Sequence, residues 1–185
     1  MAWASTDERY GLVSIALHWV MAVMIIFLFF CGRHMTGLEY THPWYHLLPS
    51  LHKSLGLIVL ALLVIRTAWM LFDKKPTPVP MPDWERITAS VVQKFFYLLM
   101  FGITFSGYLI PTADGRPVEF FNLFELPAIL SDINRQEDIA GDIHRLLSHV
   151  MMAVVVLHGL AALKHHFLDR DETLLRMLGI KTKKT

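Results

Sequence analysis

Four runs of about 20 predominantly apolar residues constrain this chain more than any other feature, because that length spans a bilayer as a helix. They cover residues 12–32, 51–72, 87–110 and 143–168. The whole chain has 185 residues, of which 54% are hydrophobic and only 18% charged, which is too apolar for a soluble domain of this size. We therefore predict an all-α fold: a single domain over residues 1–185 that forms an integral membrane four-helix bundle.

The distribution of basic residues predicts the orientation of this bundle. One side would hold the N-terminus, the 73–86 loop and the C-terminal tail, with twelve of the 17 basic residues on it and its flanks. The remaining five are Arg33, Lys53, Arg116, Arg135 and Arg145. Because basic loops stay inside, both termini are expected in the cytoplasm.

The two longer connections differ in character. Residues 73–83, DKKPTPVPMPD, carry proline at every second position, which predicts an extended cytoplasmic connector. Residues 111–141 would lie outside, and their central part, 118–130, is unusually aromatic for a solvated loop. We expect this part either to lie on the membrane surface or to fold over the mouth of the bundle.

Histidines within the fourth run carry the functional signal. His144 and His158 are 14 residues apart. At about 100° and about 1.5 Å per residue they share nearly one helix face and lie about 21 Å apart along the axis. That separation suits two planar macrocycles stacked at two depths of the membrane.

The first two helices each supply one histidine at a matching depth. His18 lies deep in the first run, and His52 lies at the outer beginning of the second. With the N-terminus inside, His52 is level with His144 and His18 is level with His158. A lone membrane histidine can simply hydrogen-bond a neighbouring helix, but two facing pairs favour shared ligands. The third helix has no histidine, so it is expected to line the site without donating a ligand.

Haem fits these pairs better than a bare metal ion does. A zinc site needs three or four protein ligands, whereas the porphyrin leaves only two axial positions on the iron for the protein. Cys31 is the single cysteine and the CxxCH attachment motif is missing, so the haem would be bound non-covalently. We predict two b-type haems, and we expect each ligand imidazole to donate its other N–H to a carbonyl or another acceptor.

Other residues lie at the same levels. Gly56, one turn after His52, and Gly159, beside His158, would let a ring approach, although glycine is also common in membrane helices. Arg66 follows His52 by 14 residues and either pairs with a haem propionate or extends to the cytoplasmic interface.

Several further polar or small residues are interpreted as structural. His149 would pack between helices, and His165 and His166 would be solvated or face lipid headgroups. The small residues of the third helix, Gly102, Ser106 and Gly107, are interpreted as allowing close helix packing.

Taken together, the motifs resemble those of the bacterial cytochrome b561 family. They are IALHW (15–19), LHKSLGLIVLALLVIRTAWML (51–71), SGYLIPTADGRPVEFFNLFELP (106–127) and IHRLLSHVMMAVVVLHGLAALKHHFLDRDETLLRML (143–178). That family includes a di-haem superoxide oxidase that passes electrons to ubiquinone. The resemblance implies that His18, His52, His144 and His158 are the four axial ligands, and that the helices lie in the inner membrane of a bacterium.

Iron with two axial imidazoles has no open position, which favours electron relay over oxygen binding. We predict an oxidoreductase that relays electrons between an outer donor, for which superoxide is our candidate, and the membrane quinone pool. Lys53, Arg116 and Arg145 flank the outer ligands and could concentrate an anionic substrate there. Pairing with Glu119, Asp142 or lipid phosphate would explain each of these cations equally well.

Two other functions stay open at this stage. The chain could be the membrane anchor and electron conduit of a separate dehydrogenase or hydrogenase, or a haem-free metal or proton transporter. The partners we expect are membrane lipid, a ubiquinone-type quinone, and superoxide or a redox protein at the outer face, with no nucleic acid.

Overall fold

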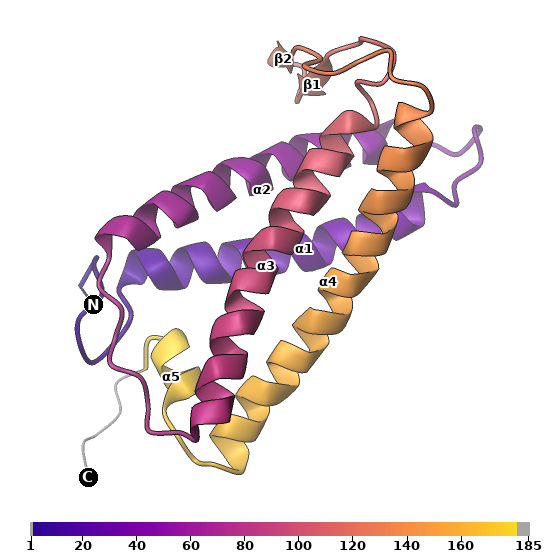
Figure 1. Cartoon of the computed structure of the whole chain (residues 1–185). Coiled ribbons are helices and arrows are strands. Elements are labelled where there is room, and N and C mark those ends of the chain that lie inside the picture. Colours follow the sequence, from indigo (N-terminus) through magenta and orange to yellow (C-terminus); the bar gives the residue numbers. More distant parts are fainter. Residues whose placement is uncertain (1, 181–185) are drawn as a thin grey trace.

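The computed structural model describes residues 2–180 as a bundle of four long helices with a small hairpin at one end (Figure 1). The elements are α1 (Leu12–Met35), α2 (Leu47–Phe72), α3 (Asp83–Leu109), β1 (Val118–Phe120), β2 (Phe124–Leu126), α4 (Gln136–Phe167) and α5 (Thr173–Met177). The bundle agrees with the predicted all-α class, to which the two short antiparallel strands are a local exception. Lys181, Lys183 and Lys184, which entered the charge count, lie outside the described residues.

All four long helices are long and apolar enough to cross a membrane. Three of them begin before their apolar run, at Leu47, Asp83 and Gln136. The added first turns of α3 and α4 carry carboxylates, at Asp83 and Glu85 and at Glu137 and Asp138. Negative charge there is favourable because it faces the positive end of the helix dipole. Hydropathy marks only the membrane-buried part of each helix, so it missed these polar turns.

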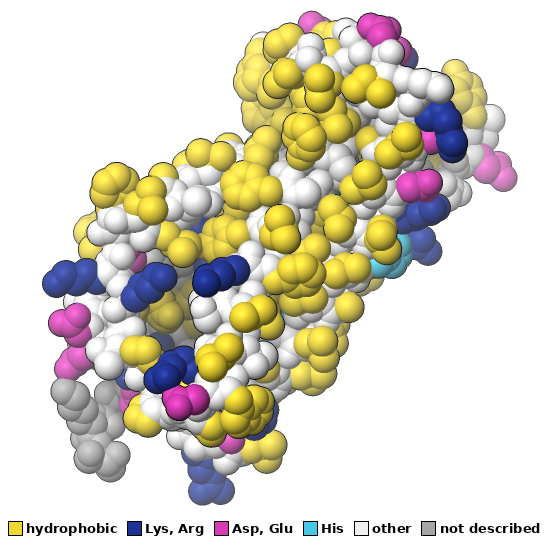
Figure 2. Space-filling model, viewed as in Figure 1, with side chains coloured by type: hydrophobic (Ala, Val, Ile, Leu, Met, Phe, Trp, Pro, Cys, Tyr) yellow, Lys and Arg dark blue, Asp and Glu magenta, His cyan; other side chains and the backbone are white. Residues whose placement is uncertain are grey.

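The helices pack in chain order, α1 against α2, α2 against α3 and α3 against α4, whereas α1 and α4 touch at few positions. The buried core consists of Met21, Leu63, Leu99, Met100 and Met151. It lies at mid-depth, since Met151 is seven residues from both His144 and His158. Many other large apolar side chains are exposed, as the face drawn in Figure 2 shows, which suits a bundle surrounded by lipid.

Several hydroxyl groups inside these helices bond to their own helix. Thr67 donates to the Leu63 carbonyl at 2.7 Å, Ser106 to the Gly102 carbonyl at 2.6 Å, and Ser148 to the His144 carbonyl at 2.6 Å. Because hydrocarbon offers no hydrogen-bond partner, this local bond lets a hydroxyl remain in a membrane helix.

The N-terminal segment, the 73–82 connector and the C-terminal segment meet at one end of the bundle, here called the inner end (Figure 1). The backbone N–H of Thr77 donates to the Asp7 carbonyl at 2.9 Å. Arg176 Nη1 in turn donates to the Thr77 carbonyl at 2.8 Å. These contacts agree with the prediction that the N-terminus, the 73–86 loop and the C-terminal tail lie on the same side of the bundle. The cytoplasmic placement of this end stays a prediction. The opposite end, which carries the hairpin, is called the outer end.

Asp73 fastens the N-terminal segment to the end of α2. Its carboxylate accepts hydrogen bonds from the Ser5 N–H at 2.8 Å, the Ser5 hydroxyl at 2.6 Å and the Ser14 hydroxyl at 2.7 Å. Burial alone would raise the pKa of Asp73, but these hydrogen bonds hold the pKa below its ordinary value. A carboxyl group whose pKa is lower in the folded state stabilises that state at neutral pH and loses the effect in acid.

We expect Asp73→Ala to release residues 5–11 from the bundle. Each hydrogen bond to the Asp73 carboxylate contributes about 1 kcal/mol to the free energy of unfolding, and the partial exposure of Asp73 reduces this contribution. Hydrogen exchange of the Ser5 and Gly11 amides should accelerate in the variant, and in the unmodified protein only below the ordinary Asp pKa. Asp7→Ala is the matched control, because the Asp7 carboxylate has no hydrogen bond among residues 2–180. Equal exchange in the two variants would contradict this role.

Candidate functional site

The structure brings two of the predicted ligands together at the outer end of the bundle. His52 begins the second turn of α2, and His144 lies in the third turn of α4. Their ring centroids are 6.1 Å apart and the ring planes are inclined by 75°. Two residues 92 positions apart in sequence are therefore neighbours at one depth of the membrane.

A second pair lies further inside the bundle. The rings of His18 on α1 and His158 on α4 have centroids 6.4 Å apart, with planes inclined by 64°. Phe96 of α3 packs edge-on against His158 at 5.4 Å, and Trp19 packs against His18 at 5.3 Å. This is the second pair predicted from the directions of the helices and the positions of the histidines along them.

Both separations fit a metal ion between the two rings. A metal–imidazole bond is about 2.0 Å long and the bonded nitrogen lies about 1.1 Å from the ring centre, so two trans ligands place their centroids about 6.2 Å apart. A direct hydrogen bond of about 2.9 Å between two rings would bring the centroids to about 5.1 Å. The observed 6.1 and 6.4 Å match the first arrangement. The residues thus fit iron with two axial imidazoles.

The outer pair is held by the backbone of neighbouring helices. His144 Nδ1 lies 2.9 Å from the Ile103 carbonyl of α3. A carbonyl can only accept, so Nδ1 carries the proton and Nε2 is the nitrogen left for a metal. This is the carbonyl acceptor that we expected for a ligand histidine. His52 Nδ1 is buried and has no hydrogen-bond partner among the described residues.

Two glycines make room for the outer imidazoles. A Cβ on Gly107 of α3 would lie 2.9 Å from the His144 ring, and a Cβ on Gly32 of α1 would lie 3.1 Å from the His52 ring. Both distances are shorter than ordinary contacts, so a side chain at either position would displace a ring. The close helix packing predicted for Gly107 brings α3 against the ring of His144, whereas the role of Gly32 was missed. Sequence could have suggested both, because each lies at the depth of the outer pair.

The other glycines have different surroundings. A Cβ on Gly102 would meet only a Leu147 methyl group, at 2.8 Å, which agrees with the helix-packing interpretation. At Gly56 and Gly159 nothing lies within 4 Å of an added Cβ. That open space is compatible with a ring at these positions, and their cofactor contact stays a prediction.

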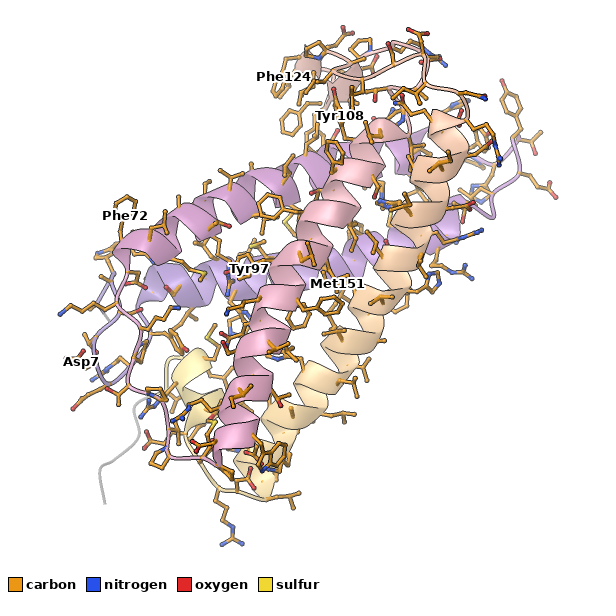
Figure 3. All side chains as sticks on the ribbon, in the orientation of Figure 1. Asp7, Phe72, Tyr97, Tyr108, Phe124 and Met151 are labelled. Atoms are coloured by element: carbon orange, nitrogen blue, oxygen red, sulfur yellow. The ribbon has the colours of Figure 1, made fainter. Side chains whose placement is uncertain are left out.

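Arg66 lies inside the bundle near the inner pair. Its Nε donates to the Tyr97 hydroxyl of α3 at 3.0 Å, and its charge acts on His18. Tyr97 lies near the middle of α3 in Figure 3. Arg66 is therefore held by Tyr97, and its pairing with a haem propionate stays a prediction.

Two of the three candidate cations are neutralised by neighbouring carboxylates. Arg116 is bound to Asp114, with Nε 2.6 Å from Oδ2, and Arg145 lies 2.9 Å from Asp142. The hydrogen bonds and charge of Arg116 also hold the pKa of Asp114 below its ordinary value. Lys53 is half-buried beside His52 and has no ion pair among residues 2–180. Of the three, Lys53 is left as the uncompensated charge next to a predicted ligand.

The remaining histidines of α4 divide into two cases. His149 Nδ1 lies 2.7 Å from the Arg145 carbonyl and the ring packs on Phe29, as expected for a packing residue. His165, which we expected to be solvated, is only 15% exposed and contacts Asp171 at 2.8 Å and Asp169 at 3.1 Å.

An ion-pair network explains the burial of His165. Lys164 bridges Glu85 of α3 at 2.7 Å and Asp169 at 2.8 Å. Glu85, His165 and Asp169 lie close enough to hold a metal ion, but the Lys164 ammonium already occupies both carboxylates. The network joins α3, α4 and the segment after α4 at the inner end.

The fold and the site together define a membrane helical bundle with two transverse imidazole pairs. A family model described as prokaryotic cytochrome b561 matches residues 9–179. Cytochrome b561 homolog 2 of Escherichia coli K12 is 44% identical over 182 residues, covering 97% of this chain and 96% of that protein. A probable superoxide oxidase CybB of Yersinia pestis is 28% identical, covering 94% and 98%. Cytochrome b561 homolog 1 of Escherichia coli K12 is 22% identical, covering 92% and 97%.

This chain belongs to the prokaryotic cytochrome b561 family. It is a multi-pass bacterial membrane protein that transfers electrons, and its family binds b-type haem. The predicted family and fold class are thereby confirmed.

We expect Gly107→Ala to remove the haem of the outer pair and leave that of the inner pair, because the new methyl group would displace the His144 ring. Gly102→Ala on the same helix is the matched control, since it meets only the flexible end of Leu147. The measurement is haem per chain by pyridine haemochrome, together with the spectrum that remains. Full haem content in Gly107→Ala would contradict the role of Gly107.

Proposed function

We propose that this protein relays electrons through two b haems between a donor at the outer end and a quinone in the membrane. The observation that carries the proposal is that two pairs of imidazole rings lie at two depths of one bundle. Their centroids are 6.1 and 6.4 Å apart, which is the spacing that a metal ion between two rings requires. One gap alone would fit a single-haem protein, and two are what a relay across the membrane needs.

The four histidines would be the protein's ligands to the two haem irons. His52 and His144 would hold one haem, and His18 and His158 the other. Bound haem supplies a one-electron carrier at each level. The protein keeps the imidazoles in the correct tautomer, as at Ile103, and places the apolar core around Met151 between the two levels. Arg66, beside His18, would balance a propionate of the inner haem.

Superoxide is the donor that we favour. A relative at 28% identity is described as a probable superoxide oxidase, and superoxide is an anion that a cation beside the outer pair would attract. Lys53 is placed to do so, whereas Arg116 and Arg145 are paired with carboxylates. The acceptor would be a ubiquinone-type quinone, with the inner end and both termini in the cytoplasm.

We expect two haems per chain in the purified protein. His158→Ala should reduce this number to one, and His144→Ala should do the same with loss of the other haem. His149→Ala is the matched control on α4, because its ring packs against Phe29 and should affect neither haem. Pyridine haemochrome gives the count. A protein without a dithionite-reducible b-type band would contradict the proposal and favour the haem-free transporter.

Mixing the oxidised protein with superoxide in a stopped-flow instrument should reduce the haem rapidly, and added quinone should reoxidise it. Lys53→Glu should lower the second-order rate constant by roughly three- to tenfold at low salt, with the difference shrinking as ionic strength rises. Lys53→Arg should retain the rate, and Arg116→Gln should change it little.

Absence of any reaction with superoxide would reject this donor. Stable co-purification with a soluble redox protein would then favour the anchor-subunit alternative. A rate that responds to neither salt nor Lys53→Glu would remove Lys53 from the proposal while leaving the relay intact.

A further inference from the structure

The hairpin at the outer end has two chemically different faces. β1 and β2 pair with Val118 opposite Leu126, Glu119 opposite Glu125 and Phe120 opposite Phe124. Because side chains alternate along a strand, the four apolar residues share one face and the two glutamates share the other. Two like charges directly opposite each other repel unless water screens them. The glutamate face must therefore point to water, and both residues are exposed.

The apolar face is only partly covered by protein. Val118 is 2% exposed where β1 packs against α2, whereas Phe124, at the far end of the hairpin, is 55% exposed. Phe120 and Phe124 stack on each other with centroids 4.7 Å apart. The hairpin thus packs on the bundle through Val118, while the Phe124 side chain is left largely uncovered, and Figure 3 places Phe124 out beyond Tyr108.

The turn that joins the strands is strained and anchored. Phe121 and Asn122 both have positive φ, 47° and 57°, and the Leu123 N–H closes the turn on the Phe120 carbonyl at 2.8 Å. Such a turn normally contains Asn-Gly, so an aromatic residue in its first position is costly. The Phe121 N–H donates to the hydroxyl of fully buried Ser54, two residues after His52, at 3.0 Å. This bond fixes the turn above the outer end of α2.

The exposed tip would be unfavourable in water. Leu123 is 76% exposed, Phe124 55% and Phe121 40%, so three large apolar side chains project from one turn. In Figure 2 the apolar surface of the hairpin continues onto the apolar side chains of the helices below it. That helical surface faces lipid in a protein that spans the membrane, so the tip extends a lipid-facing surface beyond the bundle.

We propose that the tip, Phe121 to Phe124, is inserted in the outer leaflet of the bilayer, at the boundary of headgroups and acyl chains. The apolar face of the hairpin lies toward the lipid and the Glu119–Glu125 face toward water. Aromatic side chains are favourable at this boundary, and the hydrogen bond to Ser54 holds the hairpin at that level. The hairpin is thus both a cover for the end of α2 and a membrane anchor.

A single-cysteine experiment in the full chain tests this placement. Cys31→Ala removes the only cysteine, and Leu123→Cys or Glu125→Cys then carries an environment-sensitive NBD dye. The labelled proteins are placed in vesicles of phosphatidylethanolamine and phosphatidylglycerol with acyl chains brominated near the headgroup. Glu125 is the matched control because it is an exposed residue of β2 on the glutamate face, only two residues from the turn residue Leu123. Retention of the dithionite-reducible b-type haem absorption band (the α-band) confirms that each variant is folded.

Insertion predicts blue-shifted emission at position 123, with quenching by brominated lipid roughly threefold or more above that at position 125. Aqueous iodide should quench the two labels in the reverse order. Water-like emission from both would overturn the proposal. So would shielding of position 123 from both quenchers, which indicates contact with protein. Loss of lipid quenching as the protein-to-lipid ratio rises would assign the tip to a second copy of the chain.

Discussion

The hydrocarbon core of a membrane offers an imidazole no hydrogen-bond partner, and the arrangement of this bundle follows from that constraint. Each of the four histidines in the two pairs needs a partner from a neighbouring helix or from a ligand. The Ile103 carbonyl satisfies one nitrogen of His144, while His52 Nδ1 has no partner among the described residues. Imidazole pairs whose centroids lie more than 6 Å apart do not satisfy each other. The iron of a haem held by each pair, as we propose, would resolve this deficit.

Helix α4 fixes the distance between the two levels because it contributes one histidine to each. The core cluster is packed around Met151, seven residues from both histidines, so it resists any change in the rotation of α4 against α3. α1 and α2 each supply one ligand at one level. A rotation of either would therefore disturb one pair and leave the other in place, which makes the two sites structurally separable.

Periodicity and threading were sufficient to predict the spans and the two histidine pairs, because both depend on distances along single helices. Contacts that depend on how helices rotate against each other were not predictable in this way. The approach of Gly32 to His52 and of Gly107 to His144 requires that rotation. The burial of His165 requires the chain after α4 to return with Asp169 and Asp171. The hairpin was missed because its turn contains Phe121 and Asn122 in place of the usual Asn-Gly.

The two ends of the bundle are stabilised by different interactions, and this bears on where an electron donor could approach. The inner end is closed by polar contacts at Asp73, Arg176 and His165, which bind the N-terminal segment, the connector and the C-terminal segment together. The outer end is covered over α2 by an apolar hairpin, and its arginines at 116 and 145 are paired with carboxylates. Of the three candidate cations at this end, Lys53, adjacent to His52, is the one without a carboxylate partner among residues 2–180 that an anionic donor would meet. Because Lys53 directly follows His52 in α2, the outer end of α2, rather than the paired arginines, is the place where charge could guide a donor to the outer pair.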